Sequence, residues 1–317
     1  MLREAGLHND ELLALFLSSF EPTVCLWPEY RHSLPDTIPY HLNWSTTSNL
    51  PEPYRTQLNQ ARDKWHLKRD RIIDRLTKLN QPIPDDLELG WIRLNTRTVY
   101  LDQIISKRDD SDSTANWALV PFLDCLNHSS AASTKTRIVN DRFELITEKG
   151  VEKDEQVFIS YGQHSDTFLL IEYGFVIGST NRLNYVDFLP IDIIDHVSTG
   201  AGAKRAKVDV ASVAKEYGCD SGLGVDCNGP TWSLVRFVAC ASLSRGQLKR
   251  CVYETFDEWP DDVRAVVVEQ MMVVLKAKMN VFNAAKTELE EPVLVCFLQD
   301  QLDLLSRLVV ATEHEWN

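Results

Sequence analysis

The stretch "VPFLDCLNHSS" at residues 120–130 places reactive and polar side chains directly behind an apolar run. An aspartate, a cysteine, an asparagine and a histidine follow one another closely, at Asp124, Cys125, Asn127 and His128. A thiol and an imidazole can act as a nucleophile and its base. Thiol, imidazole and carboxylate groups are also zinc ligands. The chemistry of this stretch therefore depends on which of these side chains meet.

Neither a cysteine hydrolase nor a metal site is favoured by the spacing. Cys125 and His128 are three positions apart, so on a strand their side chains point to opposite faces. Nucleophile and base usually come from separated segments instead. No HxxH, HExxH or CxxC motif is present to complete a metal site, and we predict none. The structural alternative is an asparagine and a histidine that close a buried strand, with Cys125 filling core space.

Two tyrosine–glycine pairs follow this stretch. "EQVFISYG" ends in Tyr161-Gly162, and "FLLIEYGF" contains Tyr173-Gly174 followed by Phe175. A glycine directly after each tyrosine indicates a backbone that must approach another group closely. A single pair is a weak signal, but the order of arginine in "NTRTVYL", then "DCLNHSS", then the two pairs forms a specific set.

The apolar periodicity predicts the elements that position these residues. Helical spacing is present over 10–20 and 51–79, and a shorter helix leads into "RLNTRTVYL". "SKRDDSDSTAN" is typical of a polar loop. Short strands are then expected in "WALVPFLDCLNHSS", "RIVNDRFELITEKG", "EQVFISYG" and "GSTNRLNYVDFLP".

A weakly ordered linker, "STGAGAKRAKV" at 198–208, marks the predicted domain boundary. Beyond it the chain is predicted to be helical. One helix opens at Gly229-Pro230 with Pro230 in its first turn, one runs over 261–289, and one starts at Pro292. Their apolar stripes are typical of core faces in a helical bundle.

Composition and charge limit the class of protein. The 317 residues can hold one large domain or two ordinary ones, and 44% of them are hydrophobic. Seven cysteines at irregular spacing, without a CxxC pair, indicate reduced thiols in the cytoplasm or the nucleus. The N-terminal stretch fits neither a signal peptide nor a membrane span, so we predict no membrane association. A net charge of −13 argues against direct nucleic-acid binding and favours encounter with basic proteins.

In order and spacing, these segments resemble the SET-domain protein methyltransferases. The similarity is to the branch that contains the Rubisco large-subunit lysine methyltransferase and the actin-histidine methyltransferase, and it covers nearly the whole chain. "NTRTVYL" and "GPTW" are most similar to the subgroup of SET domain-containing protein 4. The resemblance implies an α+β fold. A β-rich SET domain would span 1–197 with a helical insertion at about 40–95, and an all-α domain of the substrate-binding type would span 209–317.

The resemblance also implies a cofactor, S-adenosylmethionine, and the residues that hold it. Arg97 would meet the carboxylate of the cofactor in a charge-assisted contact. Asn127 and His128 would hold its polar and adenine edges, and Asp124 would support the same turn. Phe175 would pack against the adenine.

For catalysis, the resemblance implies roles for both tyrosines. Tyr161 would be the catalytic tyrosine, with its oxygen near the methyl group of the cofactor and near the attacking nitrogen. Tyr173 would be a second catalytic residue that lines the lysine pocket and orients that nitrogen. The expected activity is methyl transfer to a lysine of a protein, such as a histone or another basic protein. The alternatives are a protein-histidine methyltransferase and a catalytically inactive SET-like interaction module.

The sequence departs from the family pattern in two places. The family begins with a β-rich segment that carries a Gly-x-Gly loop, whereas the glycine nearest the start of this chain is Gly6. We expect the sequence to be a fragment or an alternative gene model rather than a natural loss. For the chain as written, we expect weak cofactor binding and an exposed sheet edge. The second departure is Phe143, where family members often carry a tyrosine.

Overall fold

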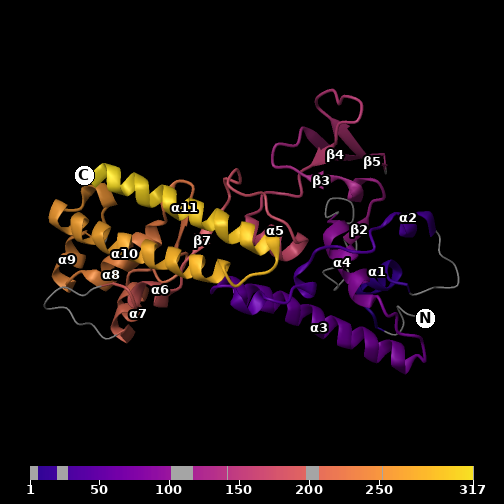
Figure 1. Cartoon of the computed structure of the whole chain (residues 1–317), viewed down its shortest axis with the longest axis horizontal. Coiled ribbons are helices and arrows are strands. Elements are labelled where there is room, and N and C mark those ends of the chain that lie inside the picture. The colour runs from indigo at the N-terminus through magenta and orange to yellow at the C-terminus, as the bar shows by residue number, and fades with distance from the viewer. Residues whose placement is uncertain are drawn as a thin grey trace. The chain divides into compact units, whose positions relative to one another are not determined.

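A computed structural model of the chain describes residues 6–19, 28–100, 117–140, 142–197, 207–251 and 253–316. The chain divides into two compact units (Figure 1). The first unit comprises Met1–Asn43, Leu58–His164 and Ile171–Gly174, and the second comprises Trp44–Gln57, Ser165–Leu170 and Phe175–Asn317. The predicted SET and C-terminal domains stay predictions, because most of the linker proposed to separate them lies outside the described residues, as does the polar loop at 106–116.

Helices form one side of the first unit. They are α1 (Asn9–Leu17), α2 (Pro28–Ser33), most of α3 (Tyr54–Lys78) and α4 (Leu87–Arg97), with a 3-10 turn η1 at His41–Asn43. The helices predicted from periodicity over 10–20, 51–79 and before "NTRTVYL" are thereby confirmed within the described residues. The start of α1 is capped, since the backbone N–H of His8 donates to Glu11 Oε2 at 2.7 Å.

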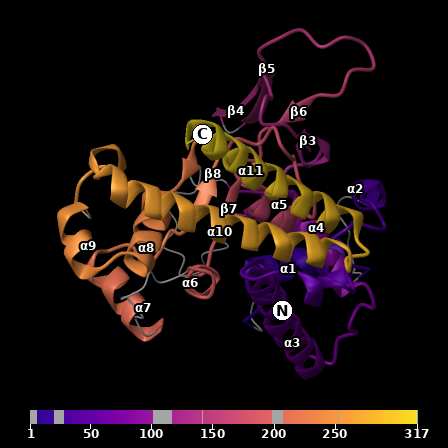
Figure 2. The same ribbon diagram turned by 60° about the vertical axis from the view of Figure 1, so that its left-hand side comes forward.

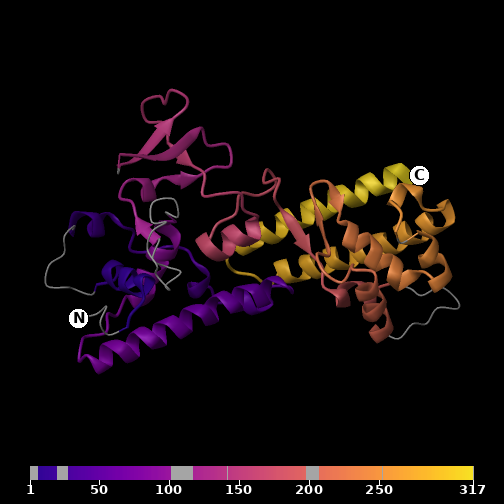
Figure 3. The same ribbon diagram turned by 180° about the vertical axis from the view of Figure 1, so that it is seen from behind.

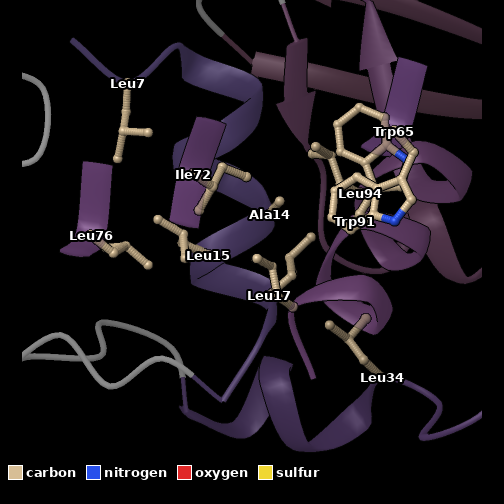
Figure 4. Close-up of a cluster of buried hydrophobic side chains, with 11 residues drawn as sticks. Leu7, Ala14, Leu15, Leu17, Leu34, Trp65, Ile72, Leu76, Trp91 and Leu94 are labelled. Carbon is tan, nitrogen blue, oxygen red and sulfur yellow. The ribbon is translucent and has the colours of Figure 1, made fainter. Parts of the chain in front are cut away.

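The core of this helical side is built from α1, α3 and α4. Figure 4 shows the buried cluster, in which Trp65 of α3 and Trp91 of α4 lie nearly parallel with ring centroids 5.2 Å apart. Leu15 and Ile72 are also fully buried there. Each such side chain stabilises the fold by about 1.5–3 kcal/mol. Gly90 lets α4 approach α1, because a Cβ at this position would lie 2.4 Å from the carbonyl oxygen of Ala14.

Short strands form the other side of the first unit. β1 (Thr98–Tyr100) pairs antiparallel with β2 (Trp117–Leu119), and β3 (Asn127–His128) pairs parallel with β6 (Phe158–Ile159). The strand structure predicted in "RIVNDRFELITEKG" is part of an antiparallel hairpin of β4 (Thr134–Val139) and β5 (Arg142–Thr147), whose strands lie side by side in Figure 2. Since each of these sheets has two strands in the described part of the chain, apolar side chains such as Ile138 and Ile146 stay partly exposed.

The expectation of one buried strand through "WALVPFLDCLNHSS" is wrong. β2 ends at Leu119, a 3-10 turn η3 follows at Leu123–Cys125, and pairing resumes at Asn127. Pro121 carries no N–H to continue the ladder, and Phe122 has a left-handed φ of 71°. Phe122 is 87% exposed. Cys125 is exposed as well, so its predicted place in the core is also wrong.

The second unit is mainly helical. It contains the first residues of α3 and of α5 (Asp166–Tyr173), together with a 3-10 turn η2 (Thr47–Asn49), α6 (Pro190–Ile194), α7 (Lys207–Glu216), α8 (Trp232–Ser242), α9 (Arg245–Cys251), a 3-10 turn η4 (Phe256–Glu258), α10 (Asp261–Lys286) and α11 (Pro292–Trp316). Its antiparallel sheet has the order β7 (Tyr185–Asp187), β8 (Gly224–Asp226) and β9 (Gly229–Pro230). α10 and α11, the two long helices predicted near the C-terminus, run side by side in opposite directions (Figures 1 and 3).

The predicted place of Pro230 is wrong. Pro230 ends β9, and α8 begins two residues later at Trp232. Thr231 is the N-cap, because its hydroxyl accepts the backbone N–H of Leu234 at 3.2 Å. A threonine hydroxyl satisfies a free N–H of the first turn, which proline cannot do.

A buried carboxylate organises the segment after α5. Asp166 is fully buried, and its Oδ1 accepts hydrogen bonds from the backbone N–H of Ile177 at 3.0 Å and from Asn181 Nδ2 at 2.8 Å. Its Oδ2 accepts from the backbone N–H of Gly178 and from Asn184 Nδ2, both at 2.9 Å. Four donors satisfy the charge, so the loop between α5 and β7 has one preferred path.

The described part of the chain contains no membrane-spanning helix, no metal-binding cluster and no disulfide. None of the helices there is long and apolar enough to cross a membrane. No three histidine, cysteine, aspartate or glutamate side chains in that part of the chain are arranged to hold a metal ion. The six cysteines within the described ranges form no disulfide, although Sγ of Cys219 lies 3.9 Å from Sγ of Cys240.

Two leucines of α3 provide a matched test of the core. Leu76 is fully buried, whereas Leu67 is 73% exposed on the same helix. Leu76→Ala is expected to lower the free energy of unfolding by about 2–5 kcal/mol through lost contacts and a cavity. Leu67→Ala is expected to change it by no more than about 0.5 kcal/mol. Urea denaturation followed by circular dichroism measures both, and equal losses would contradict this packing of α3.

Candidate active site

A cavity of about 410 Å³ lies within the first unit, at the junction of its helices and strands. The end of α4, the turn η3, the strands β1, β4, β5 and β6, and the end of α5 contribute to its wall. The lining residues are Thr96, Arg97, Thr98, Val99, Tyr100, Leu123, Asp124, Thr134, Thr136, Phe143, Ile159, Ser160, Tyr161 and Tyr173. Four of the predicted site residues therefore share one cavity, Arg97, Asp124, Tyr161 and Tyr173, and Phe143 lines it as well.

Arg97 is the last residue of α4 and brings a positive charge to the cavity wall. Its Nη1 donates to the backbone carbonyl of Asp124 at 2.7 Å. Its Nε is buried and finds no acceptor among the described residues. Because a guanidinium presents its donors in a planar fork, a ligand carboxylate or phosphate would suit the remaining donors.

Asp124 is buried in η3 and has a structural partner of its own. The hydroxyl of Tyr30 donates to Asp124 Oδ2. Burial, followed by this hydrogen bond to the carboxylate, raises the pKa of Tyr30 well above its ordinary value. Tyr30 therefore remains a protonated donor across the physiological pH range. The carboxylate of Asp124 and its carbonyl are thus held from two directions, by Tyr30 and by Arg97.

The two tyrosines lie against each other in the cavity. The ring centroids of Tyr161 and Tyr173 are 4.9 Å apart, and the hydroxyl of Tyr161 donates to the carbonyl of Leu126 at 2.8 Å. Burial is the main cause that raises the pKa of both phenols. Both are consequently neutral at physiological pH, and they can orient a ligand by hydrogen bonding but cannot act as phenolate bases.

His128 supports Tyr161 from β3. The Nδ1 of His128 accepts the backbone N–H of Tyr161 at 3.0 Å, and the two rings lie 5.2 Å apart. Asn127 precedes it on the same strand, is exposed, and is not part of the cavity wall. Phe175 belongs to the second unit and is not among the residues that line the cavity. The predicted cofactor contacts of Asn127, His128 and Phe175 therefore stay predictions.

The thiol of Cys125 does not have the surroundings of a nucleophile. Although Cys125 is exposed as a residue, partial desolvation of its thiol, followed by the charge of Asp124, raises the pKa of Cys125. Reactive thiols need the opposite shift, since the thiolate is the nucleophile. The Nδ1 of His128 is occupied by the backbone of Tyr161, which further disfavours the hydrolase interpretation.

Behind Tyr173 lies a cluster of hydrogen-bonded polar side chains that no sequence motif indicates. Asn95 Nδ2 donates to the hydroxyl of Tyr40 at 2.8 Å and to the carbonyl of Glu172 at 2.9 Å. This group ties α4 to the end of α5 and so fixes the position of Tyr173. Tyr40 and Tyr30 both come from the proline-rich, aromatic segment 27–44, where no periodicity indicates which side chains face the site.

The turn after Tyr173 requires a glycine. Gly174 has φ of 79°, and a Cβ there would lie 2.2 Å from the carbonyl oxygen of Pro39. The close backbone approach predicted from the tyrosine–glycine pair is therefore present at Gly174.

Replacement of two glycines by alanine distinguishes the steric effect of the contact between Gly174 and Pro39 from the cost of backbone strain alone. Gly218 has φ of 64° with no atom within 4 Å of its would-be Cβ, so Gly218→Ala is expected to cost about 1 kcal/mol of strain. Gly174→Ala adds a clash with rigid backbone, for a total of about 2–6 kcal/mol. Thermal unfolding monitored by circular dichroism distinguishes the two. If Gly174→Ala lowered the stability by no more than Gly218→Ala, the close contact between the backbones of residues 39 and 174 would be contradicted.

Comparisons with known proteins place this site in context. Mouse SET domain-containing protein 4 is 31% identical to the chain over 254 residues, which cover 71% of the chain and 54% of the mouse protein. The ribosomal lysine N-methyltransferase set11 of Schizosaccharomyces pombe is 24% identical over 162 residues, which cover 50% of the chain and 40% of that protein. The chain thus spans about half the length of the curated relatives it matches. No family model matches the chain.

Solved structures support the fold. The SET domain of LSMT bound to methyllysine and AdoHcy aligns with 96% of the chain and 74% of that protein, at a TM-score of 0.55 and 15% identity. Rubisco LSMT bound to sinefungin and monomethyllysine aligns over the same shares with a TM-score of 0.57. The α+β fold class predicted from the sequence is confirmed by these matches. In sequence the chain is similar to SET domain-containing protein 4, and it shares the fold of the SET domain of Rubisco LSMT.

Proposed function

We propose that the chain carries the site of an S-adenosylmethionine-dependent protein-lysine N-methyltransferase. The observation that supports this proposal most directly is the cavity in the first unit. It joins a guanidinium with a donor to spare to two neutral tyrosines. The relatives whose names state an activity include lysine methyltransferases, and the similar solved structures hold methyllysine with AdoHcy or sinefungin.

The residues of the cavity fit the proposed cofactor. S-adenosylmethionine supplies, when bound, a methyl group that its sulfonium makes electrophilic. Arg97 would hold the cofactor carboxylate through the donors that Asp124 leaves available. The side chain of Asp124 accepts from Tyr30, and Arg97 donates to the carbonyl of Asp124 through Nη1. Apolar lining such as Val99 and Ile159 offers surface for uncharged parts of the ligand.

The tyrosines would prepare the lysine for reaction. A lysine amine has an ordinary pKa of about 10.4 and must lose a proton to water before it can attack. A half-buried, aromatic site disfavours the ammonium form and so lowers this pKa. The neutral phenols of Tyr161 and Tyr173 can then orient the nitrogen lone pair without adding a charge. Such orientation accounts for a large part of the rate in reactions of this type.

The proposed partner is a protein that presents a lysine on a basic segment. The chain carries 46 acidic against 33 basic residues, which favours encounter with basic proteins. We also infer that the protein acts in the cytoplasm or the nucleus and contacts neither nucleic acid nor membrane directly.

Tyr161→Phe tests the catalytic role. The variant keeps the ring that packs on Tyr173 but loses the hydroxyl that the site uses for orientation. Methyl transfer to a lysine substrate is expected to fall at least about 100-fold, while binding of S-adenosylmethionine changes little. The measurement is transfer of labelled methyl to proteins of a cell extract, with mass spectrometry to identify the modified residue. Tyr253→Phe, at an exposed tyrosine, is the matched control.

Near wild-type turnover of Tyr161→Phe would remove this residue from catalysis. Label found on histidine in place of lysine would favour the alternative histidine methyltransferase. No binding of S-adenosylmethionine at millimolar concentration would favour an interaction module for the chain as written.

Arg97→Met tests the proposed carboxylate contact. Removal of a charged hydrogen-bond donor costs about 1.5–3 kcal/mol, which corresponds to about a 10- to 150-fold weaker affinity for S-adenosylhomocysteine in calorimetric titration. The control, Arg137→Met, removes a charge on β4 whose partner is Glu144. Arg97→Met with unchanged affinity and an unchanged unfolding transition would contradict the contact.

A further inference from the structure

A second cavity, of about 630 Å³, lies within the second unit and plays no part in the proposed transfer site. It is bounded by the β9 turn, the start of α8, the turn η4, and one face each of α10 and α11. We call it the α8–η4 groove. Its lining residues are Asn228, Gly229, Pro230, Trp232, Val235, Arg236, Glu254, Phe256, Asp257, Trp259, Val267, Val268, Met271, Leu308, Ala311 and Thr312.

One wall of the α8–η4 groove is aromatic. Trp232 is 52% exposed although it begins a helix whose other residues are mostly buried. Phe256 packs edge-on against the buried Trp259, with ring centroids 5.1 Å apart, and Trp259 Nε1 donates to the carbonyl of Glu254 at 3.2 Å. Phe256 is thereby supported from behind and stays accessible in front. Rigid, partly exposed aromatic rings of this kind are typical anchors in protein interfaces.

The rim of the α8–η4 groove is acidic. Glu254 and Asp257 line it, and the segment 254–262, "ETFDEWPDD", carries five carboxylates and no basic residue. Arg236 is the only cationic residue of the lining, and it is buried. Its guanidinium stacks on Trp232 at 3.6 Å from the ring centroid and donates to the carbonyl of Glu254 at 3.2 Å. Arg236 therefore supports the ring of Trp232 from within, while Glu254 and Asp257 are exposed to solvent.

We propose that the α8–η4 groove docks a basic peptide segment of the partner protein. A leucine or phenylalanine of that segment would pack against Trp232 and Phe256, and lysine or arginine side chains beside it would face Glu254 and Asp257. Charge complementarity selects this occupant over a second copy of the chain, because a chain of net charge −13 is repelled by an acidic rim. The docking itself is independent of methyl transfer, and only the identification of the segment with the methyl acceptor rests on the proposed function.

The probe is a fluorescein-labelled nine-residue peptide with leucine and phenylalanine between lysines and arginines. Its affinity is measured by fluorescence anisotropy against a matched peptide in which glutamate replaces every basic residue. The basic peptide is expected to bind at least tenfold more tightly, and its affinity should fall as salt is raised. Equal affinity for both peptides would overturn the proposal.

Two variants locate the binding. Glu254→Gln with Asp257→Asn removes the rim charges and leaves in place the backbone carbonyl of Glu254, which accepts from Arg236 and Trp259. This double variant should lower the affinity for the basic peptide at least threefold and make that affinity less dependent on salt. The control, Glu288→Gln with Glu290→Gln, removes the same charge from exposed positions outside the groove and should leave binding unchanged. Equal effects of the two double variants would show a nonspecific charge effect and overturn the site.

Trp232→Ala tests the aromatic wall and should weaken binding about tenfold or more, with circular dichroism to verify folding. An unchanged affinity in a folded Trp232→Ala protein would overturn the proposed occupant. So would a wild-type protein that is dimeric when the Trp232→Ala protein is monomeric. Tyr161→Phe should bind the peptide as the wild type does. Loss of transfer with retained docking, or the reverse, therefore separates failure of the catalytic proposal from failure of this one.

Discussion

The hydrogen bond from Arg97 to the carbonyl of Asp124 is the contact on which the candidate site depends. It joins the end of a helix to a 3-10 turn that has little regular structure around it, and Tyr30 secures the same turn through the side chain of Asp124. Short two-stranded sheets cannot position side chains through extended ladders. In their place, part-buried side-chain hydrogen bonds hold the turn, β3 and the segment around Tyr161 in register.

Few side chains of the candidate site carry a charge. Arg97 is its cation, Asp124 is occupied by a neutral donor, and both tyrosines are held neutral by burial. A site with this electrostatic character can bind an anionic group at one end and keep an amine uncharged at the other. Methyl transfer to nitrogen has both requirements, because the amine must be uncharged to attack while the carboxylate of the cofactor stays ionised. The acidic rim of the second unit, for which we propose attraction of a cationic partner, is built on a separate set of helices.

Periodicity was sufficient for the long elements. The helices α1, α3, α4, α10 and α11 follow from apolar spacing, because a stripe of large side chains can be buried in one way only. The sequence also predicted strand structure in the region of β4 and β5, but their pairing as a hairpin was found only in the structure. Periodicity failed at residues 117–130, where hydrophobic character suggested one strand. Pro121 interrupts the ladder, and the apolar side chain of Phe122 stays exposed, which hydropathy does not reveal.

By itself, the sequence determined the resemblance to SET-domain proteins and the identity of the residues that could do chemistry, since the order of Arg97, Asp124, Tyr161 and Tyr173 is visible in the chain. Only the tertiary structure decided that these four line one cavity, that His128 supports the backbone of Tyr161, and that Tyr30, Tyr40 and Asn95 hold the site from behind. The supporting residues lie tens of positions away from those they contact. No local pattern encodes such contacts, because they depend on how packed helices and turns converge in space.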